Sequence, residues 1–128
     1  MIETGIKGRQ ETIVTEENSA KAVGSGTLLV FATPAMIALI EETAWKSVAS
    51  FLEEGEGTVG TKLDVAHISA TPVGMKVWCE TELTEVDRRR LVFTVAVYDE
   101  KGKIGEGTHE RFVISNEKFM EKANAKKA

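Results

Sequence analysis

The sequence predicts an α+β domain in which an antiparallel sheet of about five strands wraps around one long central helix. Two observations lead to this prediction. The stretch from Pro34 to Leu52 contains no interior glycine or proline, and apolar residues recur along it at helical spacing. After this stretch the spacing of apolar residues changes to two, which is typical of strands that bury one face.

Composition limits the classes of protein to which the chain can belong. Its 128 residues suit a single domain over residues 1–128, and 42% hydrophobic with 28% charged residues indicate a soluble globular protein. The net charge is -4 and no basic run is interleaved with aromatics, so we expect no nucleic-acid partner. Cys79 is the single cysteine, and no apolar stretch resembles a signal peptide or a membrane span. We therefore expect a cytoplasmic protein with no membrane partner.

The first half of the chain is predicted to form one strand and the helix. A strand is expected over residues 2–14, followed by a polar, glycine-containing loop over residues 15–25. Thr33 is a suitable N-cap, and Pro34 suits the first helical position because its missing N–H has no partner to lose there. The helix is expected to end before Gly55.

The second half is predicted to form four strands and a short terminal helix. The strands are expected at residues 59–69, 77–83, 91–97 and 104–114, with a hairpin turn over residues 99–102 and a helix over residues 116–127. Short links make these strands antiparallel neighbours, and the sheet buries the helix on its concave face. One sheet around one helix is a small core, so we expect a homodimer.

Glu41 is the most informative residue of the predicted helix. At 3.6 residues per turn it falls near the centre of the apolar side, which is formed by Ile37, Ala44, Trp45, Val48, Phe51 and Leu52. Burying an ionised carboxylate without partners is costly, so such a residue usually has a partner and often a function. A structural ion pair with a basic residue inside a dimer remains the alternative.

His67 is the second candidate catalytic residue. It alternates with Leu63 and Val65, so its side chain should face the helix. Histidine is suited to proton transfer near pH 7, although a lone histidine is more often a satisfied core residue. Together with Glu41 in a partly dry cleft, it could activate water or assist a covalent intermediate.

Two further positions could serve a substrate. A hydroxyl at Thr33 would lie beside the helix N-terminus, which suits an oxyanion, but roughly 12 Å from Glu41 along the axis, so a reacting group or water would have to lie between them. Residues 55–60 match G-x-G-x-x-G, but the required order of strand before and helix after is reversed, which argues against dinucleotide binding. Gly60 could still bring backbone close to a ligand.

The last strand and the cysteine complete the list of candidates. His109 and Arg111 share one face of that strand; we expect His109 to face solvent beside Glu106 and Glu110, whereas Arg111 could orient a carboxylate or hold a phosphate. The two histidines lie far apart and no ligand-spaced cluster exists, so no metal is expected. Cys79 is expected to be a small buried apolar group.

These features together resemble a known family. Strand, long helix and four antiparallel strands resemble the hotdog fold. Residues 31–41 (Phe31 to Glu41) and 65–74 (Val65 to Gly74) resemble the fluoroacetyl-CoA thioesterase type of that superfamily, over about residues 5 to 115. The joint spacing of Thr33, Glu41 and His67 is the most specific part of the match. Gly60 and Arg111 match more weakly, because single glycines and arginines are common.

The resemblance implies hydrolysis of short acyl-CoA thioesters at a dimer interface, with no cofactor other than the coenzyme A of the substrate. It implies Glu41 as nucleophile or as the base that activates water, His67 as proton shuttle and Thr33 as a positioning hydrogen-bond partner. It also implies that the Gly60 backbone contacts the thioester carbonyl and that Arg111 orients the substrate or the catalytic residues.

The chain departs from this family at one place. The fluoroacetyl-specific enzyme is associated with phenylalanines that gate the acyl pocket ahead of the helix, and residues 23–29 contain none. We therefore expect a broader or different short-chain acyl specificity. The alternatives are a non-catalytic acyl-CoA binding module and a hotdog dehydratase; the Asp-x-Asn-Pro-x-His string of one dehydratase branch is absent from the sequence.

Overall fold

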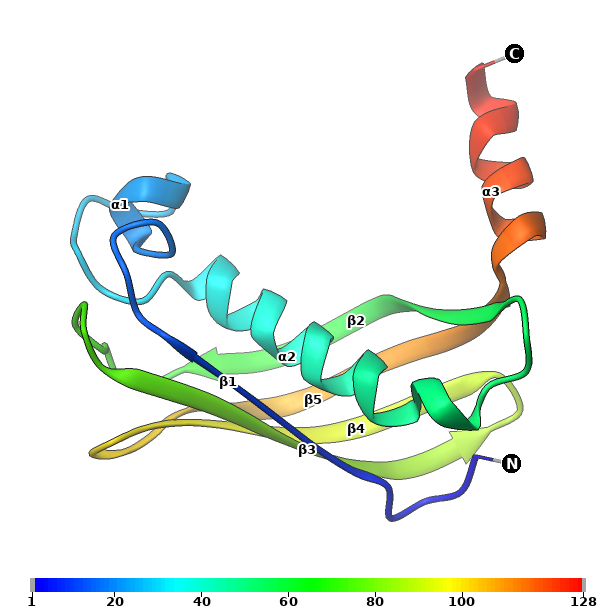
Figure 1. The fold of residues 1–128 in the computed structure, drawn as a ribbon, viewed down its shortest axis with the longest axis horizontal. Helices are drawn as coiled ribbons and strands as arrows, with labels where there is room; N and C mark the ends of the chain where they lie inside the picture. Colours follow the sequence, from blue (N-terminus) through cyan, green and yellow to red (C-terminus); the bar gives the residue numbers. More distant parts are fainter. Residues whose placement is uncertain (1, 128) are drawn as a thin grey trace.

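The computed structural model describes residues 2–127, and in that range a five-stranded antiparallel sheet curves around helix α2 (Figure 1). The strands are β1 (Lys7–Ile13), β2 (Glu56–His67), β3 (Lys76–Asp87), β4 (Arg90–Asp99) and β5 (Gly102–Ser115). The helices are α1 (Ala20–Val23), α2 (Thr33–Val48), which a 3-10 turn over Ala49–Phe51 extends, and α3 (Asn116–Asn124). The predicted sheet around one long helix is confirmed.

The order of the strands differs from the expected one. The sheet runs β1-β3-β4-β5-β2, so β2 pairs with β5 and not with its successor β3. Residues 68–75 form a longer link than a hairpin turn, and they carry the chain from one edge of the sheet to a position beside β1 at the other. Every pair is antiparallel, as predicted. β2 is therefore an edge strand, with one side available for pairing.

The core lies between the sheet and α2. The predicted inward faces of β3 and β4 are confirmed, because alternate residues are buried: Val77, Cys79, Thr81 and Leu83 on β3, and Leu91, Phe93, Val95 and Val97 on β4. Burying a side chain of this kind contributes about 1.5–3 kcal/mol, so truncating Leu91 to alanine should cost about 2–5 kcal/mol.

Helix α2 faces the sheet with a different side from the predicted one. Its buried residues are Met36, Leu39, Ile40, Thr43, Ala44 and Val48. Trp45 and Phe51, which were assigned to the buried stripe, are each 43% exposed. The predicted stripe is rotated by about a quarter of a turn because the helix carries apolar residues on two sides, and the sheet covers only one of them. Glu41 consequently lies at the border of the buried face rather than at its centre.

The start of α2 also differs by one residue. Ala32 occupies the N-cap position, Thr33 is the first helical residue and Pro34 follows it, so the predicted N-cap role of Thr33 is wrong. The consequence is functional, since the Thr33 hydroxyl is available for another partner.

At the other end of the chain α3 projects away from the sheet after β5 (Figure 1). Within residues 2–127, no helix combines the length and apolar character that spanning a membrane requires.

Candidate active site

Thr33 and His67 meet at the start of α2. The two residues come from α2 and from the end of β2, and Thr33 Oγ1 lies 2.8 Å from His67 Nδ1. His67 faces the helix because it alternates along β2 with outward-facing Ala66 and Asp64, as predicted. The ring of Phe31 packs edge-on to the imidazole, with 6.4 Å between ring centroids. We call this pair the threonine–histidine group.

The second nitrogen of His67 is free to react. Among residues 2–127, Nε2 of His67 is buried and has no hydrogen-bond partner. The His67 side chain borders a hollow of about 290 Å³, together with Phe31, Thr33 and Ser69 among others. Burial lowers the pKa of His67 below its ordinary value of 6.5, while the backbone at Ser69 opposes the shift. The imidazole is therefore neutral at pH 7 and can accept a proton.

Glu41 lies in a second cluster, next to Arg111 of β5. Arg111 Nη1 donates to Glu41 Oε2 across 3.3 Å, and the Arg111 side chain is 6% exposed whereas that of Glu41 is 39% exposed. Thr58 of β2 holds the rest of the guanidinium: its hydroxyl accepts from Nε at 2.8 Å and its carbonyl from Nη2 at 3.0 Å. Thr58 thus fixes the position of the Arg111 guanidinium, and the Glu41 carboxylate is partly exposed to solvent.

His109 belongs to the same cluster, which corrects the expectation that it faces solvent. It is fully buried, with Nδ1 2.8 Å from the Lys62 carbonyl and Nε2 3.1 Å from Arg111 Nη1. His109 and Arg111 share the inward face of β5 with Val113, while Glu106 faces outward. The alternation with Val113 was visible in the sequence, but the neighbouring glutamates suggested a solvated strand.

Gly60 lies against the carboxylate. A Cβ at this position would lie 2.5 Å from Glu41 Oε2 and 3.2 Å from Arg111 Nη1. The β2–β5 register shifts between Gly60 and Lys62, which marks a bulge at this point. Only glycine lets the carboxylate approach the backbone of β2 so closely. We call Glu41, Thr58, Gly60, His109 and Arg111 the glutamate–arginine group.

The two groups do not meet within one chain. Thr33 and Glu41 are separated by about 12 Å along α2, and Gly60 and His67 by about 23 Å along β2. Within the chain His67 bonds to Thr33, and Glu41 bonds to Arg111, so the predicted meeting of Glu41 and His67 would need a second copy of the chain. Each group has its own hollow, since about 360 Å³ opens beside Arg111, Thr58 and Trp45.

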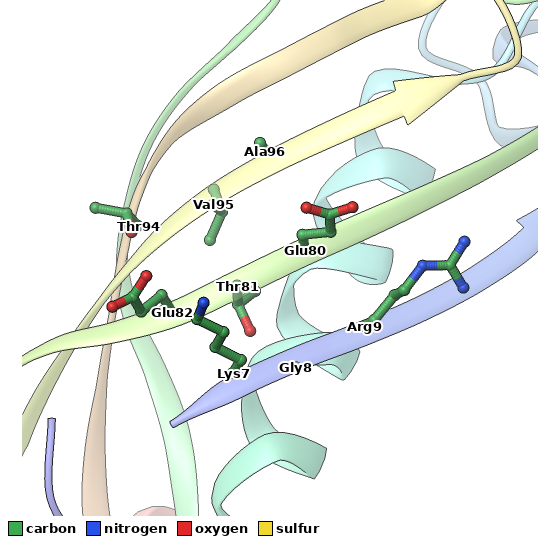
Figure 2. A pocket seen from close by; sticks show the side chains of 9 residues that line it. All are labelled: Lys7, Gly8, Arg9, Glu80, Thr81, Glu82, Thr94, Val95 and Ala96. Carbon is green, nitrogen blue, oxygen red and sulfur yellow. The ribbon is translucent and has the colours of Figure 1, made fainter. Parts of the chain in front are cut away.

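A larger hollow of about 470 Å³ lies elsewhere, over β1, β3 and β4 (Figure 2). Exposed residues such as Lys7, Arg9, Glu80 and Glu82 line it on the face of the sheet opposite α2. It contains none of the predicted site residues. Its charges are mixed, and a shallow surface of this kind offers no converging reactive groups.

Among the described residues, neither the Cys79 thiol nor a metal site adds a further reactive group to the two described above. Burial raises the pKa of the Cys79 thiol to about 11, so it stays protonated at pH 7 and is a poor nucleophile. Within the described range 2–127, no three His, Cys, Asp or Glu side chains are grouped so that they could hold a metal ion.

Comparison with known proteins identifies the family. The family model described as "Fluoroacetyl-CoA-specific thioesterase" matches residues 14–117. A fluoroacetyl-CoA thioesterase from Streptantibioticus cattleyicolor is 45% identical over 97 residues, which cover 76% of this chain and 70% of the relative.

Solved structures agree with this match. A mutant of the fluoroacetyl-CoA enzyme FlK in complex with acetyl-CoA superposes with a TM-score of 0.94 at 34% identity, over 99% of this chain and 100% of that one. A thioesterase superfamily member from Thermus thermophilus superposes with a TM-score of 0.91 at 28% identity, over 99% and 94% of the two chains. The predicted hotdog fold and the predicted class of thioester hydrolase are confirmed, and the chain belongs to the fluoroacetyl-CoA-specific thioesterase family.

Proposed function

We propose that this thioesterase hydrolyses short-chain acyl-CoA thioesters, with Glu41, His67 and Thr33 as its catalytic residues. The observation that carries the proposal is the presence of two complementary groups, a carboxylate held by a cation and an imidazole that can accept a proton. Glu41 is a carboxylate seated on a buried guanidinium, and His67 is a neutral imidazole with a buried, unpartnered nitrogen among the described residues. The name of the Streptantibioticus relative and the acetyl-CoA bound to the FlK mutant support an acyl-CoA substrate.

The chemistry follows from these groups. Glu41 attacks the thioester carbonyl carbon, or removes a proton from a water molecule that attacks it. The carbonyl becomes an oxyanion; in this proposal it is stabilised by the Gly60 backbone and by the N–H groups at the start of α2 from the other subunit. In the water route the C–S bond then breaks, and His67 passes the proton that Glu41 removed from water to the leaving thiolate, so a carboxylic acid and coenzyme A are released. In the covalent route the thiolate leaves first; His67 then takes a proton from the water that hydrolyses the acyl-Glu41 anhydride, and the thiolate receives that proton.

We infer that a second copy of the chain completes the site. β2 is an edge strand, and pairing two β2 strands antiparallel about a two-fold axis brings the His67 end of one beside the Gly60 half of the other. Ile37, Glu41 and Trp45 form a strip at i, i+4 and i+8 on α2, next to the buried face. Trp45 is 43% exposed, so this strip has apolar surface for a partner to cover.

The acyl specificity is expected to be broader than fluoroacetyl. The segment ahead of α2, residues 23–29, lacks the gating phenylalanines, and residues 23–29 are all exposed. Residues 23–29 therefore place no bulky aromatic side chain in the way of a slightly longer acyl chain.

The test is thiol release from acetyl- to octanoyl-CoA, fluoroacetyl-CoA and phenylacetyl-CoA. Glu41→Gln is run beside the wild type, and Glu42→Gln serves as a matched control. Glu42 is the next residue of the same helix and pairs with Lys46 on the outer side. We expect turnover to fall by about 10³-fold or more in Glu41→Gln and to stay within about twofold in Glu42→Gln.

Two outcomes would contradict the proposal. Near-wild-type turnover in Glu41→Gln would sink the assigned role of that carboxylate. If no acyl-CoA is hydrolysed and calorimetry shows the intact thioester bound for hours, the protein is the alternative, a non-catalytic acyl-CoA binding module.

A further inference from the structure

His109 is an unusual residue for the interior of a sheet protein. Its side chain is fully buried, it stacks on Phe93 with ring centroids 6.3 Å apart, and both ring nitrogens have hydrogen-bond partners. A histidine that only filled space would be replaceable by an apolar ring. The partners of its two nitrogens instead determine its protonation state.

The hydrogen bonds of His109 define one tautomer. Arginine carries only donors and stays protonated, so the Arg111 Nη1 group must donate to His109 Nε2. The Lys62 carbonyl only accepts, so His109 Nδ1 must carry the proton that is donated to it. The imidazole is therefore neutral, with its proton on Nδ1. Burial lowers the pKa of His109, and the Arg111 charge lowers it further, whereas the hydrogen bond to the Lys62 carbonyl raises it.

The same hydrogen bond sets the direction of the arginine. Arg111 Nη1 has two hydrogens, and one of them points to His109 while the other points to Glu41. Thr58 holds Nε and Nη2, so the guanidinium plane is fixed at both ends. Removing the acceptor at His109 would leave a buried N–H without a partner, and the guanidinium would turn to satisfy it.

We propose that His109 is a positioning residue which, as the neutral Nδ1–H imidazole, holds the Arg111 guanidinium in the orientation that presents it to Glu41. This inference rests on the proposed function, in which Glu41 is the reacting carboxylate. His109 itself touches no substrate in this scheme. It acts on the reaction only through Arg111 and the position of the Glu41 carboxylate.

Two substitutions separate the two hydrogen bonds of His109. In His109→Gln the side-chain oxygen reaches the place of Nε2 and can accept from Arg111. In His109→Asn the shorter side chain reaches only the place of Nδ1, so it can bind the Lys62 carbonyl and leaves Arg111 without its acceptor. Both variants are polar and similar in size, so a loss of packing alone would affect them alike or would affect the shorter one modestly.

The kinetic test compares kcat and KM for the best acyl-CoA of the panel. We expect His109→Asn to lower kcat by about 10–100-fold with KM within about twofold, because the carboxylate position matters most in the transition state. His109→Gln should restore kcat to within about threefold of the wild type. Equal activity of the wild type and His109→Asn, or equal loss in both variants, would overturn the proposal.

A spectroscopic test is independent of activity. The ring-nitrogen NMR shifts of ¹⁵N-histidine-labelled wild-type protein at pH 7.5 should show His109 as the Nδ1–H tautomer. In ¹⁵N-arginine-labelled protein, the Arg111 Nη1 signal should move in His109→Asn but much less in His109→Gln. An Nε2–H tautomer or a charged ring would overturn the proposal. If the panel shows no hydrolysis, the proposed function fails while this measurement still decides the state of His109.

Discussion

The threonine–histidine group and the glutamate–arginine group are built in opposite ways. Thr33 and His67 share a single hydrogen bond, Thr33 is exposed, and the buried Nε2 of His67 is left without a partner among residues 2–127. Glu41 rests on Arg111, whose remaining donors are held by Thr58 and His109 in a buried network. The threonine–histidine group thus has a ring nitrogen without a partner among these residues, whereas almost all the hydrogen-bond donors of Arg111 in the glutamate–arginine group have one.

This difference teaches what each group is suited to do. A proton shuttle must change its partners during the reaction, so a free nitrogen is an advantage. A charged nucleophile or base needs a fixed position, and fixed dipoles and charges stabilise a reaction best when they need no reorganisation. In the proposed mechanism, the rigid group therefore suits the role of reacting carboxylate, and the open group suits the role of proton transfer.

The largest expected effect tests whether the two groups come from different subunits. Glu41→Gln and His67→Ala should each be inactive alone, but a mixture that has exchanged subunits should recover about a quarter of wild-type activity, because half of the dimers are mixed and each restores one of two sites. Thiol release is measured after unfolding and refolding the two variants together.

The control for this experiment is the same mixture combined after separate refolding. It should stay inactive if the dimers do not exchange. Absence of any recovery in the co-refolded sample, with dimers present by light scattering, would show that each site draws Glu41 and His67 from the same chain.

Arg111→Lys tests the rigid group. Lysine keeps the charge but cannot reproduce the planar fork that contacts Thr58, His109 and Glu41 together, so kcat should fall by about 100-fold. Unfolding in urea should also show a loss of about 1–3 kcal/mol, because His109 and Thr58 lose a buried donor. Arg89→Lys, at an exposed position of the β3–β4 turn, is the control and should change neither quantity. Wild-type kcat in Arg111→Lys would show that the fork is dispensable.

The smallest expected effect concerns the pH profile of the open group. Burial lowers the pKa of His67, so kcat/KM should decrease only at a pH below 6.5, where protonation removes the neutral base. Phe31→Ala exposes the ring to water, which weakens the desolvation and should move the limb up by a few tenths of a pH unit. A limb that moves down in Phe31→Ala would assign it to another group.

The same histidines predict how stability depends on pH. His67 and His109 both have pKa values lowered in the folded state, so the unfolded chain binds more protons as the pH falls through 6.5. Their contribution to folding is therefore complete above that pH and decreases below it. The urea midpoint should be lower at pH 5.5 than at pH 7.5, and less so in His109→Gln.

Several features of the fold and site could be predicted from the sequence because they depend on local pattern. The alternation of apolar residues assigned the inward faces of β3 and β4, and the Asp99–Gly102 turn marked the last hairpin. The inward orientation of His67 followed from its alternation with Leu63 and Val65. The family followed from the joint spacing of Thr33, Glu41 and His67, and the family match confirms it.

Other features depend on which elements become neighbours, and local pattern does not contain that information. The helix has apolar residues on two sides, and only the sheet decided that Met36 and Leu39, not Trp45, are buried. Pairing of β2 with β5 placed Thr58 and Lys62 beside Arg111 and His109, so the network around Glu41 exists only in the folded chain.

The sequence by itself determined the α+β class, the long helix with its carboxylate, the inward histidine of β2 and the resemblance to a thioesterase family, because hydrophobic period and residue spacing are written along the chain. Tertiary structure decided the strand order, the buried side of α2, the inward burial of His109 and the separation of Glu41 from His67 within one chain. The physical reason is that burial and partner choice depend on contacts between residues far apart in sequence, and a pattern of period two or 3.6 specifies a face without specifying what covers it.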